Sequence, residues 1–120
     1  MMNYYTTYSA AERFIFSREF FGMKLGLENI QDFLATLGNP QSKYKTVHIG
    51  GTNGKGSTSA MLASICRSAG YKTGLYTSPH LVNFRERIQI DGKYIPAQTV
   101  LAFVNRHRAQ LVKKKSPSLN

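Results

Sequence analysis

Apolar residues recur at helical spacing near both ends of the chain. Ser9 and Glu12 have the spacing of a capping box and predict a helix from about Ala10 to Phe21. A second short amphipathic helix is predicted from apolar residues three or four positions apart: Leu27, Ile30, Phe33, Leu34 and Leu37. Gly38–Pro40 should stop it, since a glycine and a proline end helices.

The remaining helical pattern follows Pro96, which introduces a last helix closed by Lys113–Lys115. Its apolar face comprises Val100, Leu101, Val104 and Leu111. The closing lysines suit a solvated helix C-terminus, although a nucleic-acid or membrane contact is the alternative. Four aromatic residues on the first helix are expected in the core rather than on a base-stacking surface: Phe14, Phe16, Phe20 and Phe21.

The middle of the chain has the pattern of a strand, a helix and a second strand. Thr46–Ile49 is β-prone, Ser57–Ala69 is helical and ends before Gly70, and Lys72–Thr77 is β-prone again. This length fits a βαβ unit, which predicts two parallel strands. His48, inside the first strand, is expected to be a core histidine.

A loop and a hairpin follow this unit. Ser78–Glu86 has loop character, Arg87–Ile90 alternates like an exposed strand, and Asp91–Gly92 predicts a tight turn before Lys93–Ile95. Parallel sheets occur as larger sheets covered on both faces. The sequence therefore predicts an α/β fold that is one part of a larger parallel sheet.

Composition narrows the class of protein. The 120 residues have ordinary globular composition and suffice for one domain. No apolar stretch is long enough to cross a bilayer and the start does not resemble a signal peptide, so a soluble, cytoplasmic protein is expected. Cys66 is the single cysteine, which favours a reducing compartment, a core position and no zinc module.

The charge is strongly basic, with 16 Lys and Arg against 6 Asp and Glu and a net charge of +10. From Phe33 to Arg85 there is no carboxylate. Such a balance fits nucleic acid, an anionic small molecule, or a chain separated from an acidic remainder, and the last interpretation is favoured over nucleic-acid binding.

The glycine-rich segment Gly50–Thr58 carries the chemistry. It lies where the predicted strand gives way to the helix, so glycines can turn successive amide hydrogens into one concavity beside the positive helix end. Lys55 would add a mobile charge, and Ser57 a hydroxyl for the magnesium that accompanies a nucleoside triphosphate. The match to the general phosphate-loop string is imperfect, because Ile49 and Gly56 replace its first glycine and its final hydroxyl residue.

With this departure from the general phosphate-loop string, the sequence resembles one known family. Gly51–Ser57, Thr77–His80 and Phe84–Ile88 resemble the folylpolyglutamate synthases and dihydrofolate synthases of the Mur ligase superfamily, as does Leu37–Pro40 upstream. Gly56 favours this folate branch over the cell-wall ligases. The resemblance implies that residues 1–120 are the N-terminal part of a Mur-ligase-type ATPase domain with a phosphate loop and a parallel sheet.

The resemblance also implies an activity. ATP would activate the carboxylate of folate or dihydropteroate as an acyl phosphate, which the amine of L-glutamate attacks. The metal carboxylate, a carbamylated lysine and a glutamate-binding C-terminal domain would lie beyond Asn120. The 120 residues alone are therefore expected to bind ATP weakly at best and to show no ligase turnover. The full-length family implies a monomer, with neither nucleic acid nor membrane as partner.

Site residues follow from the matched motifs. The triphosphate would be held by the loop residues Thr52, Asn53, Gly54, Lys55, Gly56, Ser57 and Thr58, with Lys55 also catalytic. Ser57 and Ser78 would bind Mg²⁺. The loop Pro79–Arg87 would close over ATP, and Pro79, His80 and Phe84 would contact the pterin.

Several alternatives remain open. Arg85, Glu86 and Arg87 have a plain interpretation as a surface ion-pair cluster. A kinase or another phosphate-loop ATPase predicts a metal-binding aspartate after an apolar strand, which this sequence lacks. A nucleic-acid-binding module would bind with an affinity that falls steeply with salt and does not change in Lys55→Ala. A non-catalytic relative that retains nucleotide binding is a third possibility.

Overall fold

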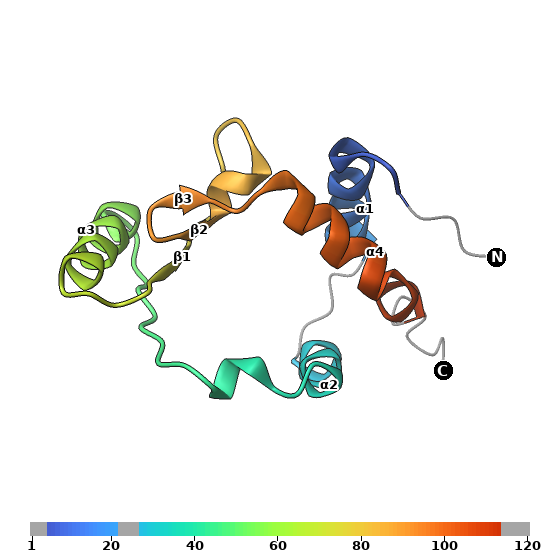
Figure 1. The fold of residues 1–120 in the computed structure, drawn as a ribbon, viewed down its shortest axis with the longest axis horizontal. Helices are drawn as coiled ribbons and strands as arrows, with labels where there is room; N and C mark the ends of the chain where they lie inside the picture. The colour runs from blue at the N-terminus through green and yellow to red at the C-terminus, as the bar shows by residue number, and fades with distance from the viewer. Residues whose placement is uncertain (1–4, 22–26, 114–120) are drawn as a thin grey trace. The chain divides into compact units, whose positions relative to one another are not determined.

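The three outer helices predicted from the apolar pattern are present in the computed structural model, which describes residues 5–21 and 27–113, with side chains at 5–17 and 27–111. They are α1 (Tyr8–Phe21), α2 (Glu28–Thr36) and α4 (Ala97–Lys113). Contacts divide the chain into two units, one comprising residues up to Thr46 together with those from Leu101, and the other Val47–Val100 (Figure 1). None of the helices in the described ranges is long and apolar enough to cross a membrane.

The start of α1 differs from the predicted capping box. The Thr7 hydroxyl oxygen accepts the Ala10 N–H at 3.2 Å, so Thr7 caps the helix two residues before Ser9. The Glu12 carboxylate instead accepts the Tyr8 hydroxyl at 3.0 Å. The Ser9–Glu12 cap is therefore wrong, because an earlier hydroxyl already serves the first free amides.

The core of the first unit lies where α1 packs on α4. Ala11, Phe14 and Val104 are buried, and partly buried apolar side chains surround them: Tyr5, Ile15, Leu101 and Leu111. The Asn105 side chain accepts the Tyr5 N–H at 2.8 Å and donates to the Tyr5 carbonyl at 2.9 Å. The predicted apolar face of the last helix is confirmed, and the amide pair fixes the preceding segment on it.

The second helix buries less than its pattern suggests. Phe33 is 8% exposed and contacts the rings of Phe103 and His107 edge-on, but Leu27 and Ile30 are 67% and 48% exposed. The predicted stop is confirmed, since Gly38 and Asn39 both have positive φ. Of the predicted aromatic core, Phe14 is buried and Phe16 half-buried. The side chains of Phe20, Phe21 and Lys113–Lys115, and the segment Ser116–Ser118, lie outside the described residues.

The second unit contains α3 (Lys55–Ser68) and three short strands. The strands β1 (Gly74–Tyr76), β2 (Ile88–Ile90) and β3 (Lys93–Tyr94) form an antiparallel sheet in that order, with Leu75 opposite Gln89 and Ile90 opposite Lys93. The helix ends as predicted at Gly70, whose φ is +91°, and the Tyr71 N–H donates to the Cys66 carbonyl. Cys66 is half-buried.

The predicted parallel βαβ unit is wrong for the described residues. Thr46–Ile49 forms no strand there, Val47 is 72% exposed and His48 is exposed rather than in a core. Among the described residues β1 is an edge strand that pairs with β2. The β2–β3 hairpin closes through a two-residue turn, whereas a parallel pair must order a whole crossover. Within these residues Thr46, Val47 and His48 are exposed and Ile49 is half-buried.

The hairpin turn is confirmed at Asp91 and Gly92, whose φ values are +51° and +83°. We expect Gly92→Ala to lower the free energy of unfolding of this unit by roughly 1–2 kcal/mol, because a side chain strains this conformation. The added Cβ would also clash with the Arg67 guanidinium. Denaturant unfolding checks this result.

Gly56→Ala is the matched control for that substitution. Gly56 lies in α3 with open space around its added Cβ, so alanine should stabilise by about 0.5–1 kcal/mol through helix propensity. Equal losses of stability in the two variants would contradict the conformational argument.

Candidate functional site

The glycine-rich segment is an exposed turn that leads directly into α3. Gly51 and Gly54 have φ of +149° and +77°, and Gly54 is the N-cap. The first bond of the helix joins the Thr58 N–H to the Gly54 carbonyl at 2.9 Å. The amides of Lys55, Gly56 and Ser57 precede this bond and so have no acceptor within the helix. Three adjacent donors are therefore available to an anion.

The first turn of this helix has a basic residue and no acidic one. Lys55 is the first residue of α3, and the first turn contains no acidic residue. A cation at a helix N-terminus opposes the helix dipole, so the free amides, the dipole and the ammonium group together favour a bound anion. The residues Thr52–Thr58 are all exposed, which leaves the turn open to a ligand.

The two predicted magnesium-binding serines lie in different segments. Ser57 is in the first turn of α3, and Ser78 follows β1. Both are exposed, and no hydrogen bond links them within the described part of the chain. Nor do the described residues contain a group of three or more His, Cys, Asp or Glu that could hold a metal ion.

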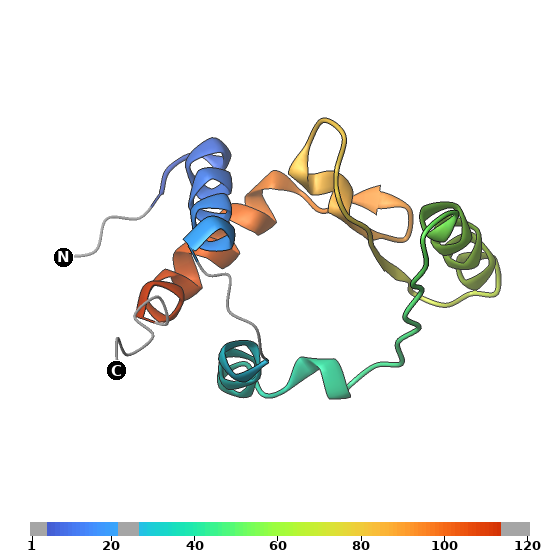
Figure 2. The same cartoon turned by 180° about the vertical axis from the view of Figure 1, so that it is seen from behind.

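The second candidate segment, residues 78–87, is a loop tied by a single carboxylate. The backbone N–H groups of Leu81, Val82 and Asn83 all donate to Glu86, at 3.1, 3.0 and 2.6 Å. The Asn83 side chain in turn accepts the Arg85 N–H, which makes a capping box at the short helix η2 (Phe84–Arg87). Figure 2 shows this loop projecting from the sheet beside β2.

Two predicted pterin-contacting residues meet in this loop. The rings of His80 and Phe84 lie edge to face with centroids 6.1 Å apart. The Arg87 Nε donates to His80 Nδ1 at 2.8 Å, and the guanidinium lies 5.6 Å from the Phe84 ring centre. Pro79 precedes them and is exposed. The structure thus brings His80 and Phe84 together and adds Arg87 to the group.

The role of the charged triplet differs from the plain ion-pair interpretation. Glu86 binds backbone amides, Arg87 binds His80, and the Arg85 Nε donates to the Ile95 carbonyl at 2.7 Å. Each side chain therefore supports the loop or its base. Asn83 and Glu86 have capping-box spacing, which is the sequence signal for the Glu86 contacts.

The amide donors also determine how the loop responds to acid. Hydrogen bonds from Leu81 and Asn83, with a smaller effect of His80, lower the pKa of Glu86 below its ordinary value. A lowered folded-state pKa stabilises the loop at and above the ordinary pKa, and this stability is lost as pH falls through the lowered pKa.

Acid titration should therefore leave the loop intact until the pH is below about 4, the ordinary range for glutamate. NMR signals of the Leu81, Val82 and Asn83 amides should then shift together. A transition above the ordinary glutamate pKa would contradict the carboxylate contacts.

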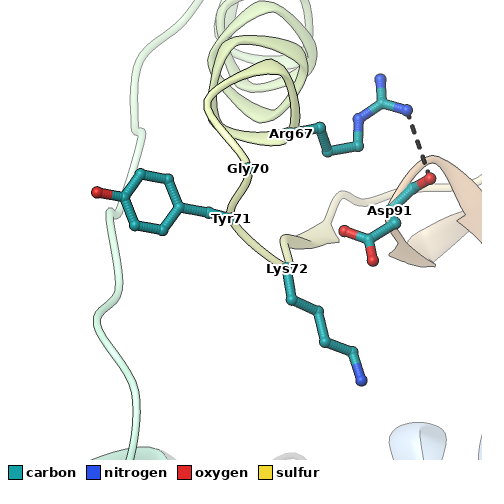
Figure 3. A pocket seen from close by; sticks show the side chains of 5 residues that line it. All are labelled: Arg67, Gly70, Tyr71, Lys72 and Asp91. Carbon is teal, nitrogen blue, oxygen red and sulfur yellow. Dashed lines mark hydrogen bonds between the residues drawn. The ribbon is translucent and has the colours of Figure 1, made fainter.

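A shallow depression at the other end of α3 is a competing candidate. It is lined by Arg67, Gly70, Tyr71, Lys72 and Asp91. Arg67 points to Asp91 and donates to its carbonyl at 3.4 Å, whereas the Tyr71 and Lys72 side chains point away (Figure 3). Because these side chains do not converge, they do not form a binding site together.

Comparison with known proteins identifies what the chain resembles. No protein-family model matches it. A dihydrofolate synthase/folylpolyglutamate synthase of Bacillus subtilis is 41% identical over 102 residues, covering 85% of this chain and 24% of the relative. The folylpolyglutamate synthase structure of Thermotoga maritima has 42% identity and a TM-score of 0.80, covering 88% of this chain and 24% of that one. A folylpolyglutamate synthase complex with AMPPCP and folate has 31% identity and a TM-score of 0.74, covering 96% of this chain and 28% of that one.

These similarities define the chain as a homologue of a class of synthases. It is a homologue of one part of the folylpolyglutamate and dihydrofolate synthases, and the resemblance of the sequence motifs is confirmed. The chain spans about a quarter of the length of the Bacillus subtilis relative. At this coarser level the fold is that of part of such a synthase, and the parallel sheet is not among the described residues.

Proposed function

We propose that Thr52–Thr58 binds the triphosphate of ATP, and that the chain supplies this site to an ATP-dependent carboxylate–amine ligase. The ligase would be of the folylpolyglutamate or dihydrofolate synthase type. The observation that carries the proposal is the set of free amides at Lys55, Gly56 and Ser57 beside an uncompensated lysine. The homologous complex with AMPPCP, a methylene analogue of ATP, and folate supports both ligand classes.

The chemistry of the proposed reaction suits these groups. Activation of a carboxylate by ATP brings two anions together, so catalysis depends on neutralising and positioning the phosphates. The loop amides would orient the phosphate oxygens, and Lys55 would offset charge on the transferred group. Ser57 and Ser78 fit magnesium as hard oxygen donors, and the bound ion would supply further positive charge.

We assign the pterin substrate to the second loop, and L-glutamate to a part of the protein outside the described residues. Pro79, His80 and Phe84 would contact the pterin of folate or dihydropteroate, and His80 is given no acid–base role. The amine of L-glutamate would attack the carbonyl of the resulting acyl phosphate, forming the amide and releasing inorganic phosphate. We assign residues 1–120 to the N-terminal part of the ATP-binding domain, apart from a C-terminal glutamate-binding domain. The enzyme would be a cytoplasmic monomer, for which free Cys66 supports a reducing compartment.

An equilibrium titration tests this proposal. The purified chain should bind AMPPCP saturably with Mg²⁺, and more weakly when EDTA removes the divalent ion. An RNA duplex of similar charge should not compete at moderate salt, because its binding would rely on diffuse phosphate contacts. Failure to bind AMPPCP up to millimolar concentration would count against the nucleotide site.

A further inference from the structure

We propose that Glu86 is a positioning residue that holds the tip of the 78–87 loop in the shape required for substrate contact. The claim that Glu86 holds the loop rests on the geometry alone, whereas the claim about substrate contact rests on the proposed function. Three consecutive backbone amides, those of Leu81, Val82 and Asn83, converge on this carboxylate. Such charge-assisted bonds to main-chain donors are stronger than neutral ones.

Side-chain burial adds little support at Leu81 and Val82. Leu81 and Val82 are 92% and 90% exposed, so burial of their side chains contributes almost nothing to the tip conformation. Short exposed segments of this kind open readily unless hydrogen bonds fix them. The Glu86 carboxylate therefore carries most of the restraint on these two residues.

The base of the loop is fixed separately, so Glu86 acts on the tip specifically. Arg85 binds the Ile95 carbonyl beyond β3, and the Thr77 N–H donates to the Arg87 carbonyl at 3.0 Å. Arg87 also binds His80, the residue that directly precedes the tip. Loss of the Glu86 carboxylate should free Leu81 and Val82 and remove the acceptor of the Asn83 amide, while the sheet and the base remain in place.

The two carboxylate oxygens accept different numbers of amides, so a glutamine substitution can separate their effects. Oε1 accepts one amide, from Leu81, and Oε2 accepts two, from Val82 and Asn83. In Glu86→Gln the single remaining oxygen can keep the pair at Val82 and Asn83, but the side-chain NH₂ would then face the Leu81 donor. Glu86→Ala removes all three acceptors.

Amide hydrogen exchange followed by NMR tests the loop-holding part. Glu86→Ala should raise the exchange rates of Leu81, Val82 and Asn83 by about tenfold or more, the range for hydrogen bonds to a charged group. Glu86→Gln should raise the Leu81 rate and spare the other two in larger part. Glu12→Gln is the matched control, since Glu12 accepts only the Tyr8 hydroxyl in α1 among its described bonds and should leave all three rates unchanged.

Ligand titration of the same variants tests the substrate part. Glu86→Ala should weaken folate binding about tenfold and weaken AMPPCP binding less, and Glu86→Gln should fall between wild type and alanine. Unchanged exchange at Leu81–Asn83 in Glu86→Ala would overturn the loop-holding role. Faster exchange with unchanged folate affinity would overturn the positioning role alone. A wild-type chain that binds neither ligand would instead count against the proposed function.

Discussion

Lys55→Ala should reduce the affinity of the chain for AMPPCP by about 10- to 100-fold, the range for hydrogen bonds to charged groups. Lys55 is the cation at the start of α3, with no acidic residue in that turn to engage it. Removal of its ammonium leaves the free amides in place, so binding should weaken without a change in the fold. Isothermal titration, together with a circular dichroism spectrum of each variant, measures both effects.

Lys72→Ala is the matched control for this lysine. Lys72 is exposed in the same unit, beside the far end of α3, and its side chain points away from the neighbouring depression (Figure 3). It should change AMPPCP affinity less than threefold, the scale of a surface charge screened by salt. Equal losses in the two variants, with a steep dependence on salt, would indicate diffuse anion binding of the nucleic-acid type rather than a nucleotide site.

Phe14→Ala should lower the free energy of unfolding of the unit that contains α1 by about 3–5 kcal/mol, the usual cost of deleting a buried aromatic side chain. Phe14 is 7% exposed, packs with Ala11 and Val104, and its ring lies 5.7 Å from that of Tyr5. A native domain is stable by only about 5–15 kcal/mol, so this unit should be largely unfolded at modest denaturant concentration. Helical circular dichroism against urea measures the loss.

Phe103→Ala provides the control with identical chemistry. Phe103 is 45% exposed and contacts Phe33 and His107. Its removal forfeits part of one aromatic cluster, and we expect a loss of about 1 kcal/mol. A Phe103 effect as large as that of Phe14 would mean that the burial on α4 does not determine the stability of this unit.

The sequence predicted elements whose signals are local. The stop at Gly38 and Asn39, the end of α3 at Gly70 and the turn at Asp91–Gly92 each depend on backbone conformations that few residues adopt, and all three are confirmed. The face of α4 that includes Val104 is likewise confirmed, because helical periodicity marks the buried side directly.

The failures involve partners that no local pattern specifies. Thr46–Ile49 has the composition of a strand, but a strand exists only when another strand pairs with it. Nothing in the described residues does so, which also leaves His48 exposed. Ser9 has the correct spacing to Glu12, yet Thr7 caps α1 because it reaches the Ala10 amide. Which of two neighbouring hydroxyls caps a helix depends on where the helix begins.

The candidate site was predictable only where its sequence signals are local. Glycines beside Lys55 indicate a turn before a helix, and the structure begins α3 at that lysine. The function of Glu86 depends on three amides that come from the chain folding back over five residues, so its charge alone suggested only a surface ion pair. The assignments of Thr52–Thr58, Ser78, Pro79, His80 and Phe84 to ligands remain predictions.

The most direct measurement is an amide NMR map of the chain titrated with AMPPCP and Mg²⁺. Binding by the free donors at the start of α3 predicts the largest shifts at Gly54, Lys55, Gly56 and Ser57, and the signals near Arg67 and Lys72 should stay in place. If the shifts instead gather around Arg67–Lys72, or spread over every basic segment while Gly54–Ser57 do not move, the account of a phosphate-binding loop is contradicted.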